Sequence, residues 1–248
     1  DYLSILNSGM EPGAGWVDVF PGKGKKSGAY CNAAYGFHPF VLLNHNDELE
    51  DTFTLAHEMG HAMHFYLSQQ AQPYATVDAP IFLAEIASTF QEEMLLSHLL
   101  KKATTKEEKL ILLNKRMENM RTTIIRQTMF GEFERLIHAE VEKGAALTAV
   151  QLGEMYIGLV KKYFGPDFTV DKYDEMEWAY IPHFYYNFYV YKYATGLMAA
   201  MVFADRVQKK VPGAVDGFKN FLSSGGSDYP LEILKRSGID FNSPEIVK

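Results

Sequence analysis

The sequence predicts a mostly α-helical fold with a small antiparallel β-sheet near the N-terminus. Three observations support this prediction. From residue 51 onward, apolar residues recur at the spacing of an α-helix. Capping-box signatures, in which a threonine precedes a glutamate or glutamine by three residues, begin helices at Thr104 and Thr148. Convincing strand signals occur only in residues 1–50, which are rich in glycine and aromatic residues.

Two short segments of residues 1–50 are the strand candidates. The first is Gly28–Cys31. The second is Phe40–Asn44, which Pro39 precedes and the polar segment His45–Asp47 follows. We expect the two segments to pair as a small antiparallel sheet, because turn-forming glycines and prolines surround them.

The helices are expected in the remaining part of the chain. The first runs from Glu50 to about Tyr66. The second begins near Asp78, which can cap it, has Pro80 in its first turn, and ends at about Leu100. Further helical segments are expected at about 104–144, 148–165, 178–210, 214–223 and 230–237. Since no repeat or Pro/Ser-rich linker divides the chain, we expect residues 1–248 to form a single domain.

Composition excludes some classes of function. Apolar residues make up 47% of the 248 residues, which is enough for a sizeable core. The net charge of −7 argues against a nucleic-acid partner, which normally requires a basic face. No apolar run reaches the length of about 18–20 residues that spans a bilayer, so we expect no membrane partner.

The single cysteine and the first residues bear on the compartment. Cys31 cannot form an internal disulfide, which fits a reducing compartment, and we expect it to be an inert, buried thiol. The segment Asp1–Ser4 has neither the basic nor the apolar region of a signal peptide, and it lacks an initiating methionine. We therefore expect a cytoplasmic protein and a chain that is a piece of a longer one.

The segment with the clearest chemistry is His57-Glu58-Met59-Gly60-His61. One helical turn takes about 3.6 residues, so the two histidines project from one face and can hold one metal ion. Glu58 can reach a metal-bound water without ligating the metal. The segment thus predicts a zinc site with Glu58 as general base, although HExxH is a short pattern that also occurs by chance.

A zinc site of this kind needs a third protein ligand, and Glu85 on the next predicted helix is the candidate. It lies among apolar residues, where a carboxylate is costly to bury unless it is paired or metal-bound. Ligating imidazoles usually donate their second N–H to a carboxylate, and either Glu92 or Asp51 can supply it or be a solvated charge. His64 shares the face of His57, and we expect it to pack or to support the site rather than to ligate.

A tyrosine-rich stretch surrounds His183. Buried tyrosine hydroxyls need hydrogen-bond partners, so a dry core accounts poorly for so many of them. In a helix, His183, Tyr186, Val190 and Tyr193 would share a face. An imidazole and two phenols on one face can donate hydrogen bonds to the oxyanion that forms when water attacks an amide.

Four segments together resemble a known family. The HEMGH motif, Glu85–Ser88, Pro182–Tyr186 and Gly28–Cys31 are similar to the oligoendopeptidase F branch of the thimet-oligopeptidase-like zinc peptidases. The resemblance implies a largely helical fold divided by a deep channel, and an intracellular endopeptidase that cleaves short, unstructured peptides. Members of this family are longer, so residues 1–248 would be the C-terminal catalytic portion. A missing N-terminal segment or another subunit would complete the channel.

The resemblance also implies roles for the metal-site residues. His57, His61 and Glu85 would hold one Zn²⁺ per chain on the channel floor. The metal would activate a water molecule for attack on the peptide bond. Glu58 would take the proton of that water and pass it to the leaving amine.

Further residues would act on the substrate according to the same resemblance. His183, together with Tyr186 or Tyr193, would stabilise the transition state. The strand Gly28–Cys31 would pair with the substrate backbone, as edge strands can. The residues expected to bind substrate are Gly28, Ala29, Tyr30 and Tyr189.

Two alternatives remain open at the level of sequence. A dipeptidyl carboxypeptidase or carboxypeptidase would need a cationic group for the terminal carboxylate of the substrate, and Arg121, Arg126 and Lys192 are available. A non-catalytic helical peptide-binding module could carry an incidental HExxH.

Overall fold

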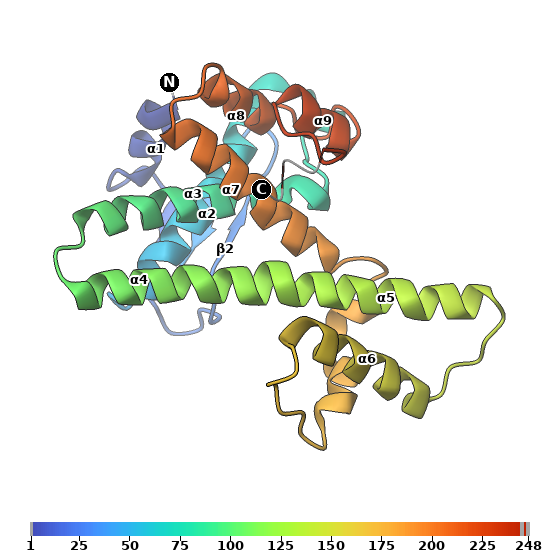
Figure 1. Ribbon diagram of the computed structural model, residues 1–248. Helices are drawn as coiled ribbons and strands as arrows, with labels where there is room; N and C mark the ends of the chain where they lie inside the picture. Colours follow the sequence, from blue (N-terminus) through green and yellow to red (C-terminus); the bar gives the residue numbers. More distant parts are fainter. Residues whose placement is uncertain (1, 244–245, 247–248) are drawn as a thin grey trace. The chain divides into compact units, whose positions relative to one another are not determined.

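The computed structural model describes residues 2–243 and 246 (Figure 1). It contains two compact units: residues 1–112 with 196–248 form the first, and residues 113–195 form the second. Helices make up most of both units, and the described strands form one small sheet in the first. The predicted mostly α-helical fold class is therefore confirmed, whereas the single catalytic domain stays a prediction.

The sheet of the first unit has the strand order β1-β3-β2. Strands β2 (Tyr30–Asn32) and β3 (Phe40–Leu42) pair antiparallel with Cys31 opposite Val41, as expected but with narrower bounds. Strand β1 (Val17–Asp18) was not predicted. It pairs parallel with β3, so the third strand depends on a long-range contact that local sequence does not reveal. Among the described strands, β2 lies at one edge of the sheet.

The central helices of the first unit are α2 (Leu49–Ala71) and α3 (Ile81–Lys102), which pack against each other. Their approach is close at Gly60, where a Cβ atom would lie 2.6 Å from both the Ala87 carbonyl oxygen and the Ser88 Cα atom. Only glycine permits this contact without a shift of one helix. The HExxH segment and Glu85 are thereby held on facing turns.

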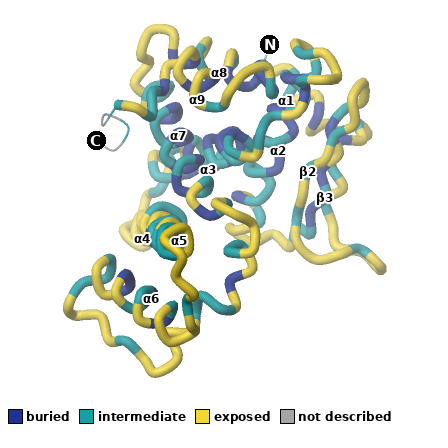
Figure 2. Tube along the Cα trace, turned by 90° about the vertical axis from the view of Figure 1, so that its right-hand side faces the viewer, coloured by how far each residue is buried: buried dark blue, intermediate teal, exposed yellow. Residues whose placement is uncertain are grey.

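Hydrophobic residues join the sheet and the remaining helices to this pair. Trp16, Val41 and Leu43 pack with Met59 and Ala62 of α2. A second cluster joins α3 to the C-terminal helices, and Figure 2 shows the buried parts of α3 and α7 in dark blue. The helices of this part of the chain are α1 (Tyr2–Met10), α7 (Tyr191–Gln208, of which 196–208 belong to the first unit), α8 (Ala214–Leu222) and α9 (Pro230–Arg236), with a short 3₁₀ turn at Tyr74–Thr76.

Helix α1 was not predicted, whereas α8 and α9 match the expected segments within one residue at each end. A segment of nine residues that contains serine, asparagine and glycine has little helical propensity by itself. Tertiary packing stabilises this helix instead: Gly9 lies so close to the Trp16 ring that a Cβ atom at this position would overlap it.

Helix starts show where the capping predictions succeed and fail. Thr148 and Gln151 form the predicted capping box at α6 (Ala149–Phe164). The other box forms one residue later than predicted, with the Glu108 N–H donating to Thr105 Oγ1 at 3.1 Å and Glu108 accepting in return. Asp78 does not cap α3, because the extended Pro80 occupies the N-cap position without a side-chain hydrogen bond.

The second unit is built on a long helical stretch. Helix α4 (Lys106–Asn119) begins in the first unit and leads through a π-helical segment (Met120–Ile125) into α5 (Arg126–Glu142). Helix α6 packs against α5, and aromatic and aliphatic residues of both helices form a buried cluster. Two 3₁₀ segments, Asp174–Tyr180 and Pro182–Tyr185, follow before α7 begins.

The predicted helix over 178–210 is wrong in its first half. The chain forms 3₁₀ turns up to Tyr185, and α7 begins only at Tyr191. Pro182 has no N–H for a helical ladder, and Phe188 adopts a left-handed φ of 53°. His183, Tyr186 and Tyr193 therefore do not share one α-helical face.

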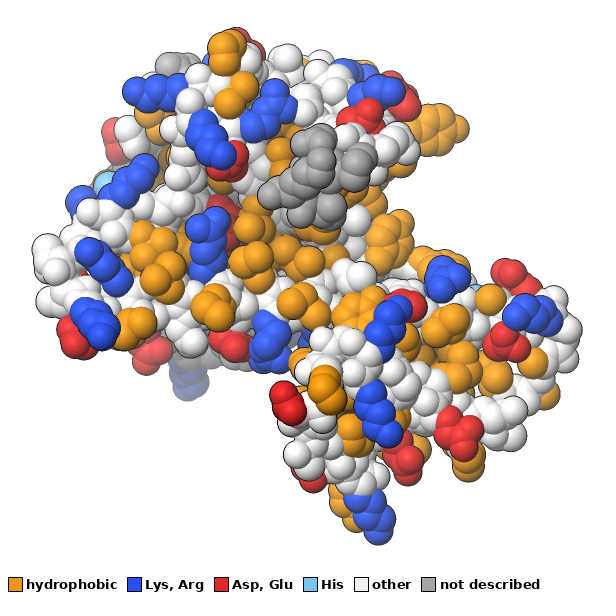
Figure 3. Space-filling model, viewed as in Figure 1, with side chains coloured by type: hydrophobic (Ala, Val, Ile, Leu, Met, Phe, Trp, Pro, Cys, Tyr) orange, Lys and Arg blue, Asp and Glu red, His pale blue; other side chains and the backbone are white. Residues whose placement is uncertain are grey.

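Some hydrophobic side chains remain at the surface, and Figure 3 shows several along α4. Leu110, Ile111 and Met117 are the most exposed of them. Within the described part of the chain, no helix combines the length and hydrophobicity needed to cross a bilayer.

Candidate metal centre and adjoining groove

The candidate metal centre lies between α2 and α3. His57 Nε2 and His61 Nε2 are 3.2 Å apart. Glu85 Oε2 lies 3.3 Å from His57 Nε2 and 3.5 Å from His61 Nε2. Among the described residues, these three form the one group of histidine, cysteine and acidic side chains that could share a metal ion. The structure thus brings together the three predicted ligands.

Local structure explains why the three side chains meet. The histidines lie one turn apart on α2, so their imidazoles leave the same face. Ser88 Oγ donates a hydrogen bond to Glu85 Oε2 at 3.2 Å and orients the carboxylate. On the other side, Gly196 of α7 leaves room, since a Cβ atom there would lie 3.6 Å from Glu85 Cβ.

The donor set fits a zinc ion. In a tetrahedral site with metal–donor distances of about 2.0–2.2 Å, neighbouring donors are about 3.3–3.6 Å apart. The observed separations of 3.2, 3.3 and 3.5 Å agree with this spacing. Two imidazoles and one carboxylate also match the composition of many catalytic zinc sites, which leave one position open.

Of the two predicted supporting carboxylates, Glu92 is the one that the structure places beside a metal-site imidazole. His57 Nδ1 lies 2.6 Å from Glu92 Oε1, so a neutral His57 that donates this proton presents its Nε2 lone pair to the cluster. Asp51 instead accepts hydrogen bonds from the N–H groups of Asn46 and Glu48. It caps the start of α2, because its position in the first turn faces those N–H groups and not His57.

The carboxylates make this site favourable for positive charge. Burial lowers the pKa of His57, but hydrogen bonds and charges of Glu85 and Glu92 outweigh it and raise the pKa to about 10. Burial raises the pKa of Glu85, and the two imidazoles outweigh that effect, so its pKa lies below the usual value. A metal cation bound at this site would replace the second ring proton of His57 and would be stabilised by the same carboxylates.

His64 packs into the core and does not join the cluster. Its ring lies 5.1 Å from the Phe221 ring, centroid to centroid. Burial, together with the nearby His61, lowers the pKa of His64 to about 3, so the side chain is neutral. This placement agrees with a packing role.

Glu58 is buried beside the cluster. Its Oε2 atom has no hydrogen-bond partner among the described residues. Burial raises the pKa of Glu58, an effect that His57 and His61 partly offset. A carboxylate that lines a cavity beside His57 and has a raised pKa is suited to exchange protons with a neighbouring water molecule.

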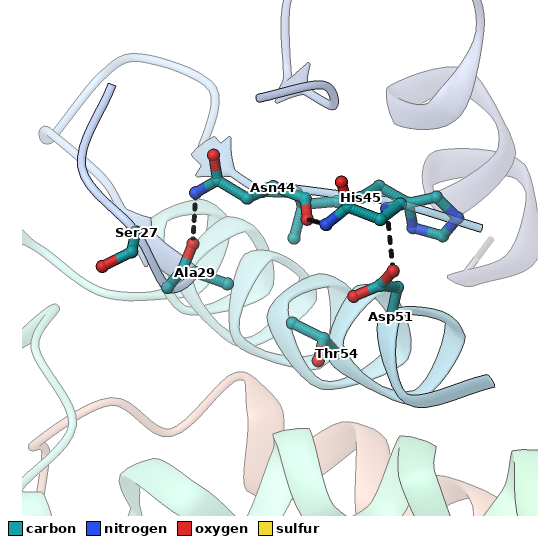
Figure 4. A pocket seen from close by; sticks show the side chains of 9 residues that line it. Ser27, Ala29, Asn44, His45, Asp51 and Thr54 are labelled. Carbon is teal, nitrogen blue, oxygen red and sulfur yellow. Dashed lines mark hydrogen bonds between the residues drawn. The ribbon is translucent and has the colours of Figure 1, made fainter. Parts of the chain in front are cut away.

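A groove runs from the metal centre past residues 27–29, the segment that directly precedes β2. One cavity of about 310 Å³ is lined by residues that include Ala29, His57 and Glu58. A second cavity of about 390 Å³ continues from it, with Ala29 and Thr54 lining both. Figure 4 shows Ala29, Asn44, Asp51 and Thr54 around the second cavity. The predicted substrate residues Gly28 and Ala29 thus line the groove.

Asn44 fixes the backbone of the segment that precedes β2, a role that the sequence analysis did not predict. Its Nδ2 group donates hydrogen bonds to the carbonyl oxygens of Lys26 and Gly28, each at 2.8 Å. In the sequence, Asn44 stands only as the end of a predicted strand. An asparagine directly after a strand was a signal for such cross-strand bonding, although its partners lie 16 and 18 residues away. Tyr30, on β2 itself, is 54% exposed.

The tyrosine-rich stretch forms a separate cluster in the second unit. The Tyr193 hydroxyl lies 3.5 Å from His183 Nε2 and 3.5 Å from the Tyr189 hydroxyl. The Tyr189 ring stacks on His183 with a centroid distance of 5.6 Å. Tyr186 is 66% exposed. Its ring lies 6.3 Å from that of Tyr189, centroid to centroid, and its backbone N–H donates to the His183 carbonyl at 3.1 Å. The structure therefore groups these predicted residues, although through 3₁₀ turns and not through one helical face.

The fold and the centre define a class of protein: a helical protein with an HExxH helix and a glutamate on the next helix. Comparison of the sequence with known families is more specific. The chain belongs to peptidase family M3, whose model matches residues 2–248.

Individual relatives agree with this assignment. The chain is 44% identical over 248 residues to the oligopeptidase PepF of Bacillus subtilis, covering all of this chain and 37% of that protein. A crystal structure from Chlamydophila abortus matches with a TM-score of 0.93 and 44% identity over 99% of this chain and 41% of that one. Oligoendopeptidase-F of Enterococcus faecium matches with a TM-score of 0.73 and 39% identity, covering 80% of this chain and 36% of that one. The chain thus spans about two fifths of the length of these relatives.

Proposed function

We propose that this chain carries the catalytic centre of a zinc-dependent endopeptidase that hydrolyses internal bonds of short, unstructured peptides. The observation that carries the proposal is the set of three donors at 3.2–3.5 Å with Glu58 beside them. Membership of peptidase family M3 and the oligoendopeptidase names of the relatives support the same reaction.

In this proposal, His57, His61 and Glu85 hold one Zn²⁺ per chain. A zinc ion at this place supplies Lewis-acid polarisation of the scissile carbonyl and lowers the pKa of water. Glu92 keeps Nδ1 of His57 protonated and turns Nε2 toward the metal position.

Glu58 is the proton carrier. Its carboxylate, which lines the cavity beside His57, accepts a proton from the attacking water as the oxygen–carbon bond forms. The same carboxyl then delivers that proton to the nitrogen of the leaving amine as the carbon–nitrogen bond breaks. The raised pKa of Glu58, which comes from burial, brings the carboxyl closer to the pKa range in which both transfers are efficient.

The groove past residues 27–29 and the neighbouring edge of β2 supply a place for the substrate backbone. An extended peptide can add to the open edge of β2 through main-chain hydrogen bonds, with Gly28, Ala29 and Tyr30 as its neighbours. Because backbone pairing does not depend on side chains, this mode fits an enzyme that accepts many extended peptides and excludes folded chains.

The cluster of His183, Tyr189 and Tyr193 supplies hydrogen-bond donors. We assign His183 and either Tyr193 or Tyr186 to the oxyanion that develops on the scissile carbonyl, and Tyr189 to substrate contact. Support for Tyr193 comes from its hydroxyl, which lies within 3.5 Å of His183 Nε2.

Additional polypeptide belongs to the proposal, because the chain spans about two fifths of its relatives. We propose that a further segment of the same protein, or another subunit, completes the peptide channel, and that the enzyme acts in the cytoplasm. Short peptides are then its partners, and nucleic acids and membranes are not.

The replacement Glu58→Gln tests the proposal. It should abolish hydrolysis of a quenched fluorescent peptide blocked at both ends, while one zinc per chain remains by elemental analysis. The blocked ends distinguish an endopeptidase from a carboxypeptidase, which needs a free terminus. Undiminished turnover in E58Q, or wild-type protein without zinc after purification free of chelators, would refute the proposal.

A further inference from the structure

Glu134 is a buried carboxyl group to which the proposed mechanism gives no role. It lies on α5 in the second unit, and its side chain is fully buried at 0% exposure. Its Oε1 atom accepts a hydrogen bond of 2.7 Å from the backbone N–H of Phe188. Its Oε2 atom has no hydrogen-bond partner among the described residues. Burying a carboxyl group this way is costly, so its single hydrogen bond needs an explanation.

Phe188 has a backbone that needs support. Its φ of 53° lies in the left-handed region, which bulky residues rarely adopt and which persists only where surroundings hold it. Its ring packs on His138 of α5, with centroids 4.7 Å apart. Glu134 and His138 are one helical turn apart, so one face of α5 contacts both the backbone and the ring of Phe188.

The same face of α5 also supports the start of α7. A Cβ atom at Gly131 would lie 3.2 Å from Tyr191 Cβ, so this glycine permits close approach. Gly131, Glu134 and His138 therefore all contact the segment 188–191.

This turn sets the places of the aromatic cluster. Tyr189 lies directly after Phe188, and its N–H donates to the Tyr186 carbonyl at 3.0 Å. Its ring lies 5.6 Å from that of His183 and 5.5 Å from that of Tyr193. A change of φ at Phe188 would rotate the following residues and separate these rings.

We propose that Glu134 is a positioning residue that accepts the Phe188 N–H and thereby holds the left-handed turn that places Tyr189 and Tyr193 beside His183. The inference rests on the proposed function, because that function gives the cluster its catalytic purpose. The turn needs an acceptor oxygen and not a negative charge, so a protonated carboxyl group serves equally well. Burial, which raises the pKa of Glu134, agrees with this.

The test compares replacements at Glu134 in the zinc-loaded protein as the cell makes it. Glu134→Gln keeps an acceptor oxygen, whereas Glu134→Leu keeps similar volume and removes it. Glu132→Gln is the matched control, because Glu132 lies on the same helix but pairs with Lys162 and Tyr163. Steady-state kinetics with the blocked peptide, zinc content and amide hydrogen exchange of residues 186–191 are measured for each.

We expect E134L to lower kcat on the order of 100-fold with little change in KM or zinc content, since misplaced catalytic groups cost about this much. Amide exchange of residues 186–191 should accelerate in E134L and stay unchanged in E134Q and E132Q. E134Q should keep kcat within about threefold, because its amide oxygen still accepts the N–H. If E134L does not fold, Glu134→Asp, which withdraws the acceptor by one methylene, should accelerate exchange at 186–191 but not in α6.

Equal kcat in E134L and the wild type, or equal losses in E134Q and E134L, would overturn the inference. Unchanged exchange at residues 186–191 in E134L or E134D would overturn it as well. The exchange measurement does not need turnover. An inactive wild-type protein would thus contradict the proposed function, while amide hydrogen exchange of residues 186–191 would still test the role of Glu134.

Discussion

Glu92 and Asp51 show how the position of a side chain within a helix decides its role. Both are acidic and both lie about two turns from a candidate ligand, so sequence spacing alone does not separate them. Asp51 lies in the first turn of α2, where free backbone N–H groups attract its carboxylate. Glu92 lies in the interior of α3, where the backbone is already paired and His57 Nδ1 is its partner.

The difference leads to a prediction for Glu92. Glu92→Gln should weaken zinc binding about 10–100-fold, because the imidazole loses the charged acceptor that orients it and raises its basicity. Competition with a chromophoric chelator measures the affinity. Asp51→Ala is the control: it should lower thermal stability slightly through loss of the cap and leave zinc affinity unchanged. Equal zinc affinities in E92Q and D51A would contradict the role of Glu92.

Glu134 leads to a second prediction at this scale, for the pH dependence of stability. Burial raises the pKa of Glu134 in the folded state, while the N–H of Phe188, His138 and Lys192 partly offset it. The folded protein then binds the proton more tightly than the unfolded chain, whose glutamates titrate near pH 4.3. Wild-type stability therefore falls relative to Glu134→Gln as pH rises from about 4.3 through the folded pKa.

Urea unfolding of the wild type and E134Q at several pH values between 4 and 8 measures this difference. The advantage of E134Q should grow as pH rises and then level off. An advantage that shrinks with rising pH would show that Glu134 is stabilised in its charged form.

At the scale of elements, the sequence predicted what depends on local spacing. The two histidines of α2 and the capping box at Thr148 need only neighbours within one turn, and both are present. Glu85 could be found because a glutamate among apolar residues needs a partner, even one from another helix. The histidines and Glu85 together account for the predicted metal ligands.

The remainder depends on contacts between distant residues. The aromatic spacing around His183 fits an α-helix, yet Pro182 and the left-handed Phe188 break it, and Glu134, 54 residues away, holds that turn. The two residues of β1 become a strand only through β3. No local period encodes such pairings, so sequence patterns could not reveal them.

The contact between α2 and α3 gives a prediction for these elements. Gly60→Ala would place a Cβ atom 2.6 Å from the backbone of Ala87 and Ser88, so one helix must shift. We expect a loss of about 1–3 kcal/mol in unfolding free energy, typical of overpacking, and weaker zinc binding, because the shift separates Glu85 from the histidines.

Gly158→Ala is the matched control for Gly60→Ala. Gly158 also lies within a helix, but a Cβ atom at this position would meet no heavy atom within 4 Å. Alanine should therefore raise stability by about 0.5–1 kcal/mol through helix propensity and leave zinc affinity unchanged. Thermal unfolding and zinc titration of both variants decide the matter. Equal behaviour of the two would show that the helices can separate without cost.

At the scale of the whole molecule, the proposed function divides its residues between the two units. The first unit contains the three metal-site residues, Glu58, Glu92 and the groove past residues 27–29. The cluster of His183, Tyr189 and Tyr193 belongs to the second. In the proposed function, metal binding and transition-state stabilisation would therefore depend on different parts of the chain and could be measured separately.

This division predicts the behaviour of the 248-residue chain by itself. Zinc should bind at one ion per chain, because all three donors and Glu92 come from two helices of one unit. If further polypeptide completes the channel as proposed, the isolated 248-residue chain should hydrolyse the blocked peptide more slowly than the full-length protein does. Elemental analysis and kcat/KM on the two forms give the comparison. Chelated, zinc-free samples serve as the control for background hydrolysis. A chain that binds no zinc would contradict the metal centre, whereas equal kcat/KM in both forms would show that residues 1–248 suffice for the channel.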